Sequence, residues 1–116
     1  MPKDYPRALR VAEQLRRELV ILIRDAVHDP RVRDFLISDV IVSKDLSTAK
    51  VYYTPYAQNT RIDELQLGLD SCAAFLRKEL GKVMRMRNIP VLSFYYDDTL
   101  ERAARLDDLL SKEKLD

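Results

Sequence analysis

Residues 7–27 carry the strongest helix signal in the chain, and this segment limits what the rest can form. Its apolar residues recur at steps of three and four, which places them on one face of an α-helix. The members of this stripe are Ala8, Val11, Ala12, Leu15, Leu19, Leu22, Ile23 and Ala26. Pro30 disfavours helical geometry in the residue before it, so we expect the helix to end near His28. A helix with one long apolar face must pack on another element.

Two β-rich runs follow, at residues 36–43 and 48–56. The short polar connection between them, about four residues long, predicts a hairpin. Apolar and polar residues alternate in both runs, so one face of the sheet is expected to be covered. The residues expected to point toward the covered face are Val40, Val42, Val51 and Tyr53.

A second helix is expected after this hairpin, with Thr60 as its N-cap and an end at residues 88–90. Its apolar stripe consists of Ile62, Leu65, Leu69, Ala73, Leu76, Leu80 and Val83. Residues 91–96 predict a third strand, with Leu92, Phe94 and Tyr96 on one face and Val91, Ser93 and Tyr95 on the other. The order helix, strand, strand, helix, strand favours an α+β fold, in which a three-stranded sheet has its helices packed on one face.

The length of 116 residues suits one compact domain. We expect residues 1–98 to form that domain and residues 99–116 to form a C-terminal extension, as a short or frayed helix. The apolar residues of the extension are Leu100, Ala103, Leu106, Leu109 and Leu110. With 47% hydrophobic and 34% charged residues, the composition is typical of globular proteins and argues against disorder.

Several classes of protein are disfavoured by the sequence. The single cysteine, Cys72, cannot form an internal disulfide, and the single histidine, His28, leaves no cluster with metal-ligand spacing. We therefore expect neither metal nor cofactor. No apolar run approaches the roughly 20 residues that span a bilayer, and the N-terminus lacks the apolar core of a signal peptide, so a cytoplasmic protein is expected.

Positive charge is concentrated in residues 72–96, although the net charge of the chain is only +1. Residues 72–96 contain five basic residues and one acidic residue. In a continuous helix, Lys78, Lys82 and Arg85 project from the face opposite the apolar stripe, flanked by Arg77 and Arg87. Exposed helix faces usually carry charges of both signs, so this pattern favours contact with the phosphates of a nucleic acid over an ordinary solvated face.

The first helix carries a second basic row opposite its apolar stripe. It consists of Arg7, Arg10, Arg17 and Arg24. Acidic residues on the same helix could neutralise these arginines through pairs one turn apart. Contact with RNA and simple solvation are therefore about equally supported for this row.

Four passages resemble the ribosome-binding factor A family. They are residues 7–12 (RALRVA), 29–32 (DPRV), 42–52 (VSKDLSTAKVY), and 80–90 (LGKVMRMRNIP) with 94–97 (FYYD). The resemblance implies a type II K-homology-like fold and a factor that binds the immature small ribosomal subunit, assists late folding or end maturation of its rRNA, and has no enzymatic activity. It also adds weight to Lys44, at the hairpin tip, as an RNA contact.

The resemblance implies a helix–kink–helix with an Ala-x-Gly interruption in place of the glycine-rich loop of ordinary K-homology domains. The matching tripeptide here is Cys72-Ala73-Ala74, which lacks the glycine. Alanine favours a continued helix by about 1 kcal/mol over glycine. No GxxG loop can be written with only Gly68 and Gly81 in the chain.

The main functional hypothesis is a monomeric, non-catalytic RNA-binding factor whose basic helix faces contact small-subunit rRNA. The predicted contacts are Arg7, Arg10, Arg17, Lys44, Arg77, Lys78, Lys82, Arg85 and Arg87. An alternative is a protein-interaction adaptor that docks through Tyr52 and Tyr95, expected on the uncovered sheet face, or through the terminal helix. Those tyrosines could also stack on unpaired bases, although strands favour tyrosine for structural reasons alone. An enzyme is the weakest reading, because no nucleophile–base pair or phosphate loop is visible.

Overall fold

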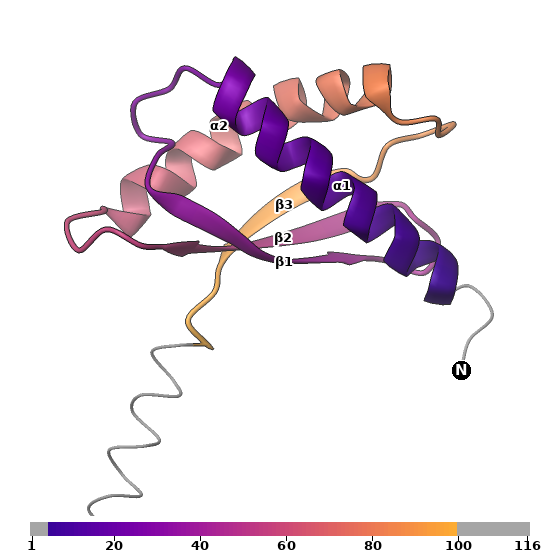
Figure 1. The fold of residues 1–116 in the computed structure, drawn as a ribbon, viewed down its shortest axis with the longest axis horizontal. Helices are drawn as coiled ribbons and strands as arrows, with labels where there is room; N and C mark the ends of the chain where they lie inside the picture. Colours follow the sequence, from indigo (N-terminus) through magenta and orange to yellow (C-terminus); the bar gives the residue numbers. More distant parts are fainter. Residues whose placement is uncertain (1–4, 100–116) are drawn as a thin grey trace, which may run out of the picture.

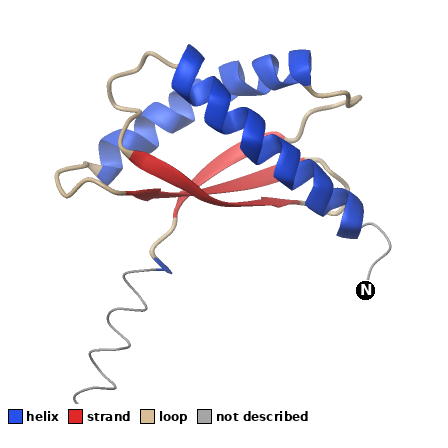
Figure 2. Ribbon diagram, viewed as in Figure 1, coloured by secondary structure: helices blue, strands red, loops and turns tan. Residues whose placement is uncertain are grey.

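The computed structural model describes residues 5–99 of the chain. In chain order its elements are α1 (Tyr5–Ala26), β1 (Phe35–Val42), β2 (Thr48–Pro55), α2 (Ile62–Val83) and β3 (Val91–Tyr96). Both helices lie on the same face of the sheet, and no described helix covers the other face (Figures 1 and 2). The predicted order and layering are therefore confirmed, whereas the predicted helix in residues 100–116 lies outside the described residues.

The sheet has the strand order β1-β2-β3, so β2 is its central strand. β1 and β2 form the predicted antiparallel hairpin, whereas β2 and β3 are parallel. A parallel pair needs a long crossover connection, which α2 supplies here. The register shifts between Ile37 and Asp39 on β1, which marks a bulge, and it pairs Tyr52 with Tyr95 across β2 and β3.

The hydrophobic core lies between the helices and the covered face of the sheet. All four residues of β1 and β2 predicted to point inward are buried. On β3, Leu92 and Phe94 are buried and Tyr96 is partly buried. The side chains with no exposed area include Leu15, Leu19, Val51, Tyr53, Leu65, Leu69, Leu76 and Leu80. Burial of one leucine contributes about 1.5–3 kcal/mol, so this packing and not helix propensity holds the two helices on the sheet. Neither described helix is long and apolar enough to cross a membrane.

A polar connection passes through this core. The hydroxyl of Tyr53 on β2 donates a hydrogen bond to the side-chain oxygen of Gln66 on α2. The amide nitrogen of Gln66 donates in turn to the carbonyl of Phe94 on β3 at 2.9 Å. Burial, aided by the negative charge of Asp70, raises the pKa of Tyr53 to about 12. The buried hydroxyl is thus satisfied, and two strands are tied to the crossover helix.

The start of α2 differs from the predicted one. Arg61, in extended geometry, is the N-cap residue and makes no capping hydrogen bond with its side chain. The Thr60 hydroxyl is buried and has no partner within residues 5–99. Thr60 as N-cap is therefore wrong, because its backbone belongs to the preceding turn, where its N–H donates to the Ala57 carbonyl at 3.1 Å. Asp63 and Glu64 lie in the first turn, where their negative charges interact favourably with the positive end of the helix dipole.

The end of α2 comes earlier than predicted. The helix stops at Val83, and Met84 is extended, with φ −101° and ψ 132°. Met84 and Ile89 are both buried, so leaving the helix early lets the segment 84–90 place two apolar side chains in the core. Val83 itself, predicted on the buried stripe, is half exposed.

The middle of α2 is continuous. Residues 71–74 are helical, so no loop interrupts α2 at the tripeptide Cys72-Ala73-Ala74. Alanine in place of the missing glycine favours this outcome. The Ser71 hydroxyl donates to the Leu67 carbonyl at 2.8 Å, and the Cys72 thiol donates to the Leu69 carbonyl at 3.4 Å.

Gly68 allows the α1–β1 loop to lie directly on α2. A Cβ at this position would lie 2.8 Å from Cγ2 of Val32 and 3.1 Å from Cβ of Arg31. The loop is braced by Asp29, whose carboxylate accepts hydrogen bonds from the Arg31 guanidinium at 2.7 Å and from the Arg31 N–H at 2.9 Å. These bonds lower the pKa of Asp29 to about 2.

Candidate nucleic-acid interface

Three segments meet at one end of the molecule: the start of α1, the β1–β2 hairpin, and the last turn of α2 with the segment 84–90 that follows it (Figure 1). Lys44 at the hairpin tip lines a pocket together with Leu9 of α1. The Val91 N–H donates to the Ser47 carbonyl at 2.9 Å, which joins the end of the segment 84–90 to the hairpin. We call this part of the protein the basic end, and its exposed cationic residues are Arg7, Arg10, Lys44, Lys82, Arg85 and Arg87.

The hairpin presents Lys44 on an ordered turn. One carboxylate oxygen of Asp45 accepts hydrogen bonds from the hydroxyls of Ser43 and Ser47, both at 2.7 Å. These bonds lower the pKa of Asp45 to about 2. Leu46 completes the turn in left-handed geometry, with φ 64°. The aspartate is thus engaged by hydroxyl groups, and Lys44 forms no ion pair within the described residues 5–99.

The last turns of α2 carry two of the predicted contacts. Lys78 is exposed and has no ion pair in the described part of the chain. Lys82 pairs with Glu79 one turn away, with Nζ 2.8 Å from Oε2, and its side chain remains largely exposed. A helix pair of this kind is worth only about 0.3–0.5 kcal/mol, so a phosphate could replace the glutamate. Both lysines remain available to an anion.

Arg77 has a different setting from its neighbours. Its Nε donates to the carbonyl of Ile89 at 3.0 Å. This bond ties α2 to the segment that leads into β3, so Arg77 holds the shape of the basic end. Arg85 and Arg87 are exposed on that segment, beyond the end of α2. The expectation that Arg85 shares a helix face with Lys78 and Lys82 is therefore wrong, because the helix ends at Val83.

The basic row on α1 is divided by the length of the helix. Arg7 and Arg10 belong to the basic end, whereas Arg24 lies seventeen residues after Arg7, or about 25 Å along the axis. Arg24 pairs with Asp25 at 2.8 Å. Arg7, Arg10 and Arg17 are exposed and form no ion pair within residues 5–99, so the predicted neutralisation affects only Arg24.

Arg16 is a contact that sequence reasoning missed. Its guanidinium donates to the carbonyl of Ile37 on the outer edge of β1 at 3.0 Å. The bond satisfies one backbone acceptor of an edge strand and holds α1 against the sheet. No pattern in the sequence distinguishes Arg16 from the exposed Arg17 beside it.

The uncovered sheet face carries the two predicted tyrosines. The rings of Tyr52 and Tyr95 lie with their centroids 5.6 Å apart, and Nζ of Lys50 lies 5.9 Å from the centre of the Tyr95 ring. Tyr95 is exposed and Tyr52 is partly exposed, so their placement on this face is confirmed.

The remaining reactive side chains form no site. Cys72 is half buried, and burial raises the pKa of its thiol. His28 is exposed at the end of α1. Within residues 5–99 no group of three or more His, Cys, Asp or Glu side chains is arranged to hold a metal ion.

Comparison with known proteins identifies the family. The family model described as ribosome-binding factor A matches residues 7–110. This chain belongs to the ribosome-binding factor A family. It is 46% identical to the ribosome-binding factor A of Thioalkalivibrio sulfidiphilus, over 97% of this chain and 87% of the relative. It is 44% identical to that of Aromatoleum aromaticum, over 97% of this chain and 88% of the relative.

Solved structures of the ribosome-binding factor A family have the same fold. The crystal structure from Thermus thermophilus superposes with a TM-score of 0.69 at 28% identity, over 77% of this chain and 93% of that one. A homology model of the Thermus thermophilus protein, fitted into a cryo-EM map of its complex with the 30S subunit, superposes with a TM-score of 0.61 at 29% identity, over 75% of this chain and 91% of that one. The fold is K-homology-like, as predicted.

The predicted RNA-binding residues remain predictions, and the structure groups them unequally. Six lie at the basic end, Lys78 lies one turn before it, Arg77 supports it, and Arg17 lies further along α1. The basic end is therefore the strongest candidate interface.

Proposed function

We propose that this protein binds the small ribosomal subunit with its basic end against rRNA phosphates, and that it assists late folding or end maturation of that RNA. The observation that carries the proposal is the meeting of three separate segments, each with exposed cations, at one end of the fold. Arg7, Arg10 and Lys44 in particular form no ion pair within residues 5–99. The 30S complex of the Thermus relative supports the small subunit as partner.

The basic end positions the protein without reading bases. Lysine and arginine contacts to phosphate carry no sequence information, so specificity comes from RNA shape and from neighbouring ribosomal surfaces. The proposed role needs binding and no catalytic step, and a monomer suffices for it. A cytoplasmic location follows from the proposal, because the subunit matures there.

A salt titration tests the proposal. The variant Arg10→Ala, Lys44→Ala, Arg85→Ala takes one cation from each of the three segments. Binding to small subunits is measured for this variant and the parent over a range of salt concentrations. Each lost phosphate contact lowers the slope of log K against log salt by about one unit, so a decrease of about two to three units is expected.

A charge-matched control separates this interface from overall charge. The variant Arg24→Ala, Arg33→Ala, Arg61→Ala removes three exposed arginines that pair with Asp25, Asp34 and Asp63, respectively, away from the basic end. Its salt slope should equal that of the parent. Equal losses in both variants would show that only net charge matters, and an unchanged basic-end variant would rule out this surface.

The adaptor hypothesis remains a second candidate because Tyr52 and Tyr95 lie side by side on the uncovered sheet face. The variant Tyr52→Ser, Tyr95→Ser tests it in the same titration. If this change releases the subunit and the basic-end variant does not, the tyrosine face is the docking surface.

A further inference from the structure

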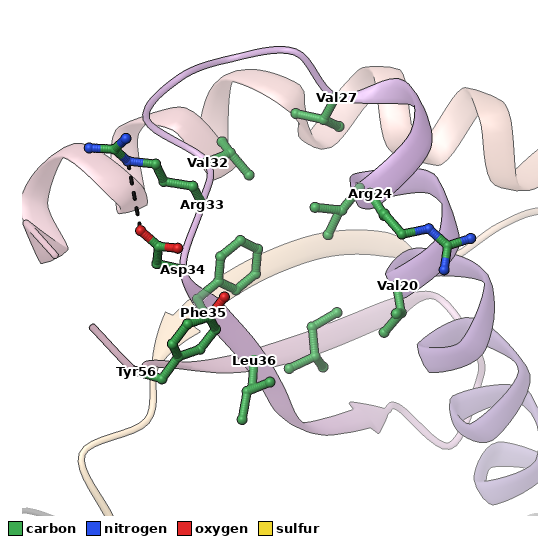
Figure 3. Close-up of a pocket in the computed structure, with 11 residues that line it drawn as sticks. Val20, Arg24, Val27, Val32, Arg33, Asp34, Phe35, Leu36 and Tyr56 are labelled. Atoms are coloured by element: carbon green, nitrogen blue, oxygen red, sulfur yellow. Dashed lines mark ion pairs between the residues drawn. The ribbon is translucent and has the colours of Figure 1, made fainter.

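An apolar groove follows the outer edge of the sheet, between the second half of α1 and β1. It consists of two adjoining pockets of about 440 and 490 Å³, which share Val20, Leu36 and Ile37. Figure 3 shows the first pocket, with Val20 facing Leu36 and Tyr56 across the opening. We call these two pockets together the edge groove.

The edge groove carries large apolar side chains that are exposed to solvent. Val20 is 47% exposed, Leu36 is 60% exposed, and Tyr56 is 64% exposed. Large apolar side chains exposed next to one another mark a surface that another element covers. Within the described residues no element lies over them.

The residues that follow β3 line part of the edge groove. Asp97 and Thr99 line the second pocket together with Leu36. The Ser38 hydroxyl of β1 donates to Oδ2 of Asp97 at 2.7 Å, which fixes the point of exit from the sheet. Oδ1 of Asp97 accepts the Thr99 N–H at 3.0 Å, as an N-cap does, and Thr99 is helical. Asp97 therefore stands in the position of an N-cap beside the edge groove.

The sequence after Thr99 has the pattern of an amphipathic helix, whose apolar face suits an apolar groove. Residues 100–110 carry an apolar stripe at helical spacing, Leu100, Ala103, Leu106 and Leu110. Eleven helical residues extend about 16 Å, which is close to the rise of about 15 Å of α1 from Arg16 to its end at Ala26. Asp107 and Asp108 are opposite in charge to Arg16 and Arg24, which line the α1 side of the groove.

We propose that residues 100–110 occupy the edge groove of the same chain as an amphipathic helix. The exit at Thr99 makes this contact intramolecular, and a short tether gives a high effective concentration. The family match extends to residue 110, so the segment belongs to the shared sequence pattern. The docked helix covers the second half of α1 and leaves the basic end, at the first half, open to RNA.

A spin label on the segment tests the proposal in the full-length protein. The label is attached at Arg105→Cys, off the apolar stripe, after Cys72→Ser removes the natural thiol. Amide signals of Val20, Leu36 and Tyr56 should broaden, while those of Lys44 and Ser93 should not. Amide exchange in residues 103–110 should slow by about tenfold or more when the helix is docked.

Two matched double variants locate the contact. Val20→Ser with Leu36→Ser changes the groove, and Ile41→Ser with Val91→Ser changes the uncovered sheet face at residues of similar exposure, 51% and 48%. The groove variant should abolish both the broadening and the exchange protection, and the sheet-face variant should keep them.

Three results would overturn the proposal. Absence of broadening and of protection would show that the segment does not dock. Broadening around Tyr95 with loss only in the sheet-face variant would place the segment on the uncovered face. Broadening that disappears on dilution with unlabelled protein would identify a second copy of the chain as the occupant.

Discussion

The substitution Gly68→Ala in α2 should have two opposing effects on the free energy of unfolding. Alanine favours the interior of a helix by about 1 kcal/mol over glycine. The new methyl group would lie 2.8 Å from Cγ2 of Val32 and 3.1 Å from Cβ of Arg31. Arg31 Cβ is close to the backbone of a loop that Asp29 braces, so it cannot move away freely.

The magnitude follows from the difference between these effects. Overpacking by one methyl group costs about 1–3 kcal/mol, so the net change is expected between about zero and 2 kcal/mol of destabilisation. The same helix contains a matched control. A Cβ at Gly81 would meet only Cγ1 of Ile89, at 3.8 Å, so Gly81→Ala should stabilise the protein by about 0.5–1 kcal/mol.

Urea unfolding at neutral pH measures both free energies of unfolding under the same conditions. The two variants should differ by about 1–3 kcal/mol with unchanged m-values. Adding Val32→Ala to Gly68→Ala should recover much of the loss caused by the methyl group, relative to Val32→Ala alone. If Gly68→Ala is as stabilising as Gly81→Ala, the loop does not press on α2 as described.

Two further predictions concern groups with shifted pKa values. Tyr53→Phe removes a buried hydroxyl donor and should cost about 1–3 kcal/mol. Because the folded-state pKa of Tyr53 is about 12, against about 10 when unfolded, its favourable contribution is present below pH 10 and is lost between pH 10 and 12; urea unfolding of parent and variant across this range should show convergence. Asp45, with a folded-state pKa of about 2, contributes stability above pH 4 that is lost as the pH falls from about 4 to 2. Acid unfolding of Asp45→Asn should therefore show a smaller loss than the parent in that window, and identical curves would show that the hairpin hydroxyls do not favour the carboxylate.

The elements of the fold were predictable where one apolar face had to be buried. The spacing in α1 and the alternation in the strands each allow a single assignment, and the structure confirms both. The ends of α2 were not predictable to the residue. Both Thr60 and Arg61 are compatible with a helix start, and the packing of the preceding turn decided between them.

The basic residues of the candidate interface were predictable from the sequence, but their arrangement in space was less so. Charge counts found the basic residues, and the grouping of Arg7 and Arg10 with Lys44 depends on how α1 crosses the sheet. Arg85 was assigned to a helix face because the helix was expected to continue to residues 88–90. Met84 instead leaves the helix and is buried, which carries Arg85 onto a separate segment.

The sequence alone determined the order of the elements, the residues that line the core, and the excess of positive charge in residues 72–96. The order of the elements and the core residues follow from local periodicity, because apolar residues that share one face must be buried. The excess of positive charge follows from composition alone. Only the tertiary structure decided which cationic side chains lie together, and that the guanidinium groups of Arg16 and Arg77 donate hydrogen bonds to backbone carbonyls. It also decided that the chain leaves the sheet beside an apolar groove. Those outcomes depend on contacts between segments that are distant in the sequence, so the residue spacing within one segment does not predict them.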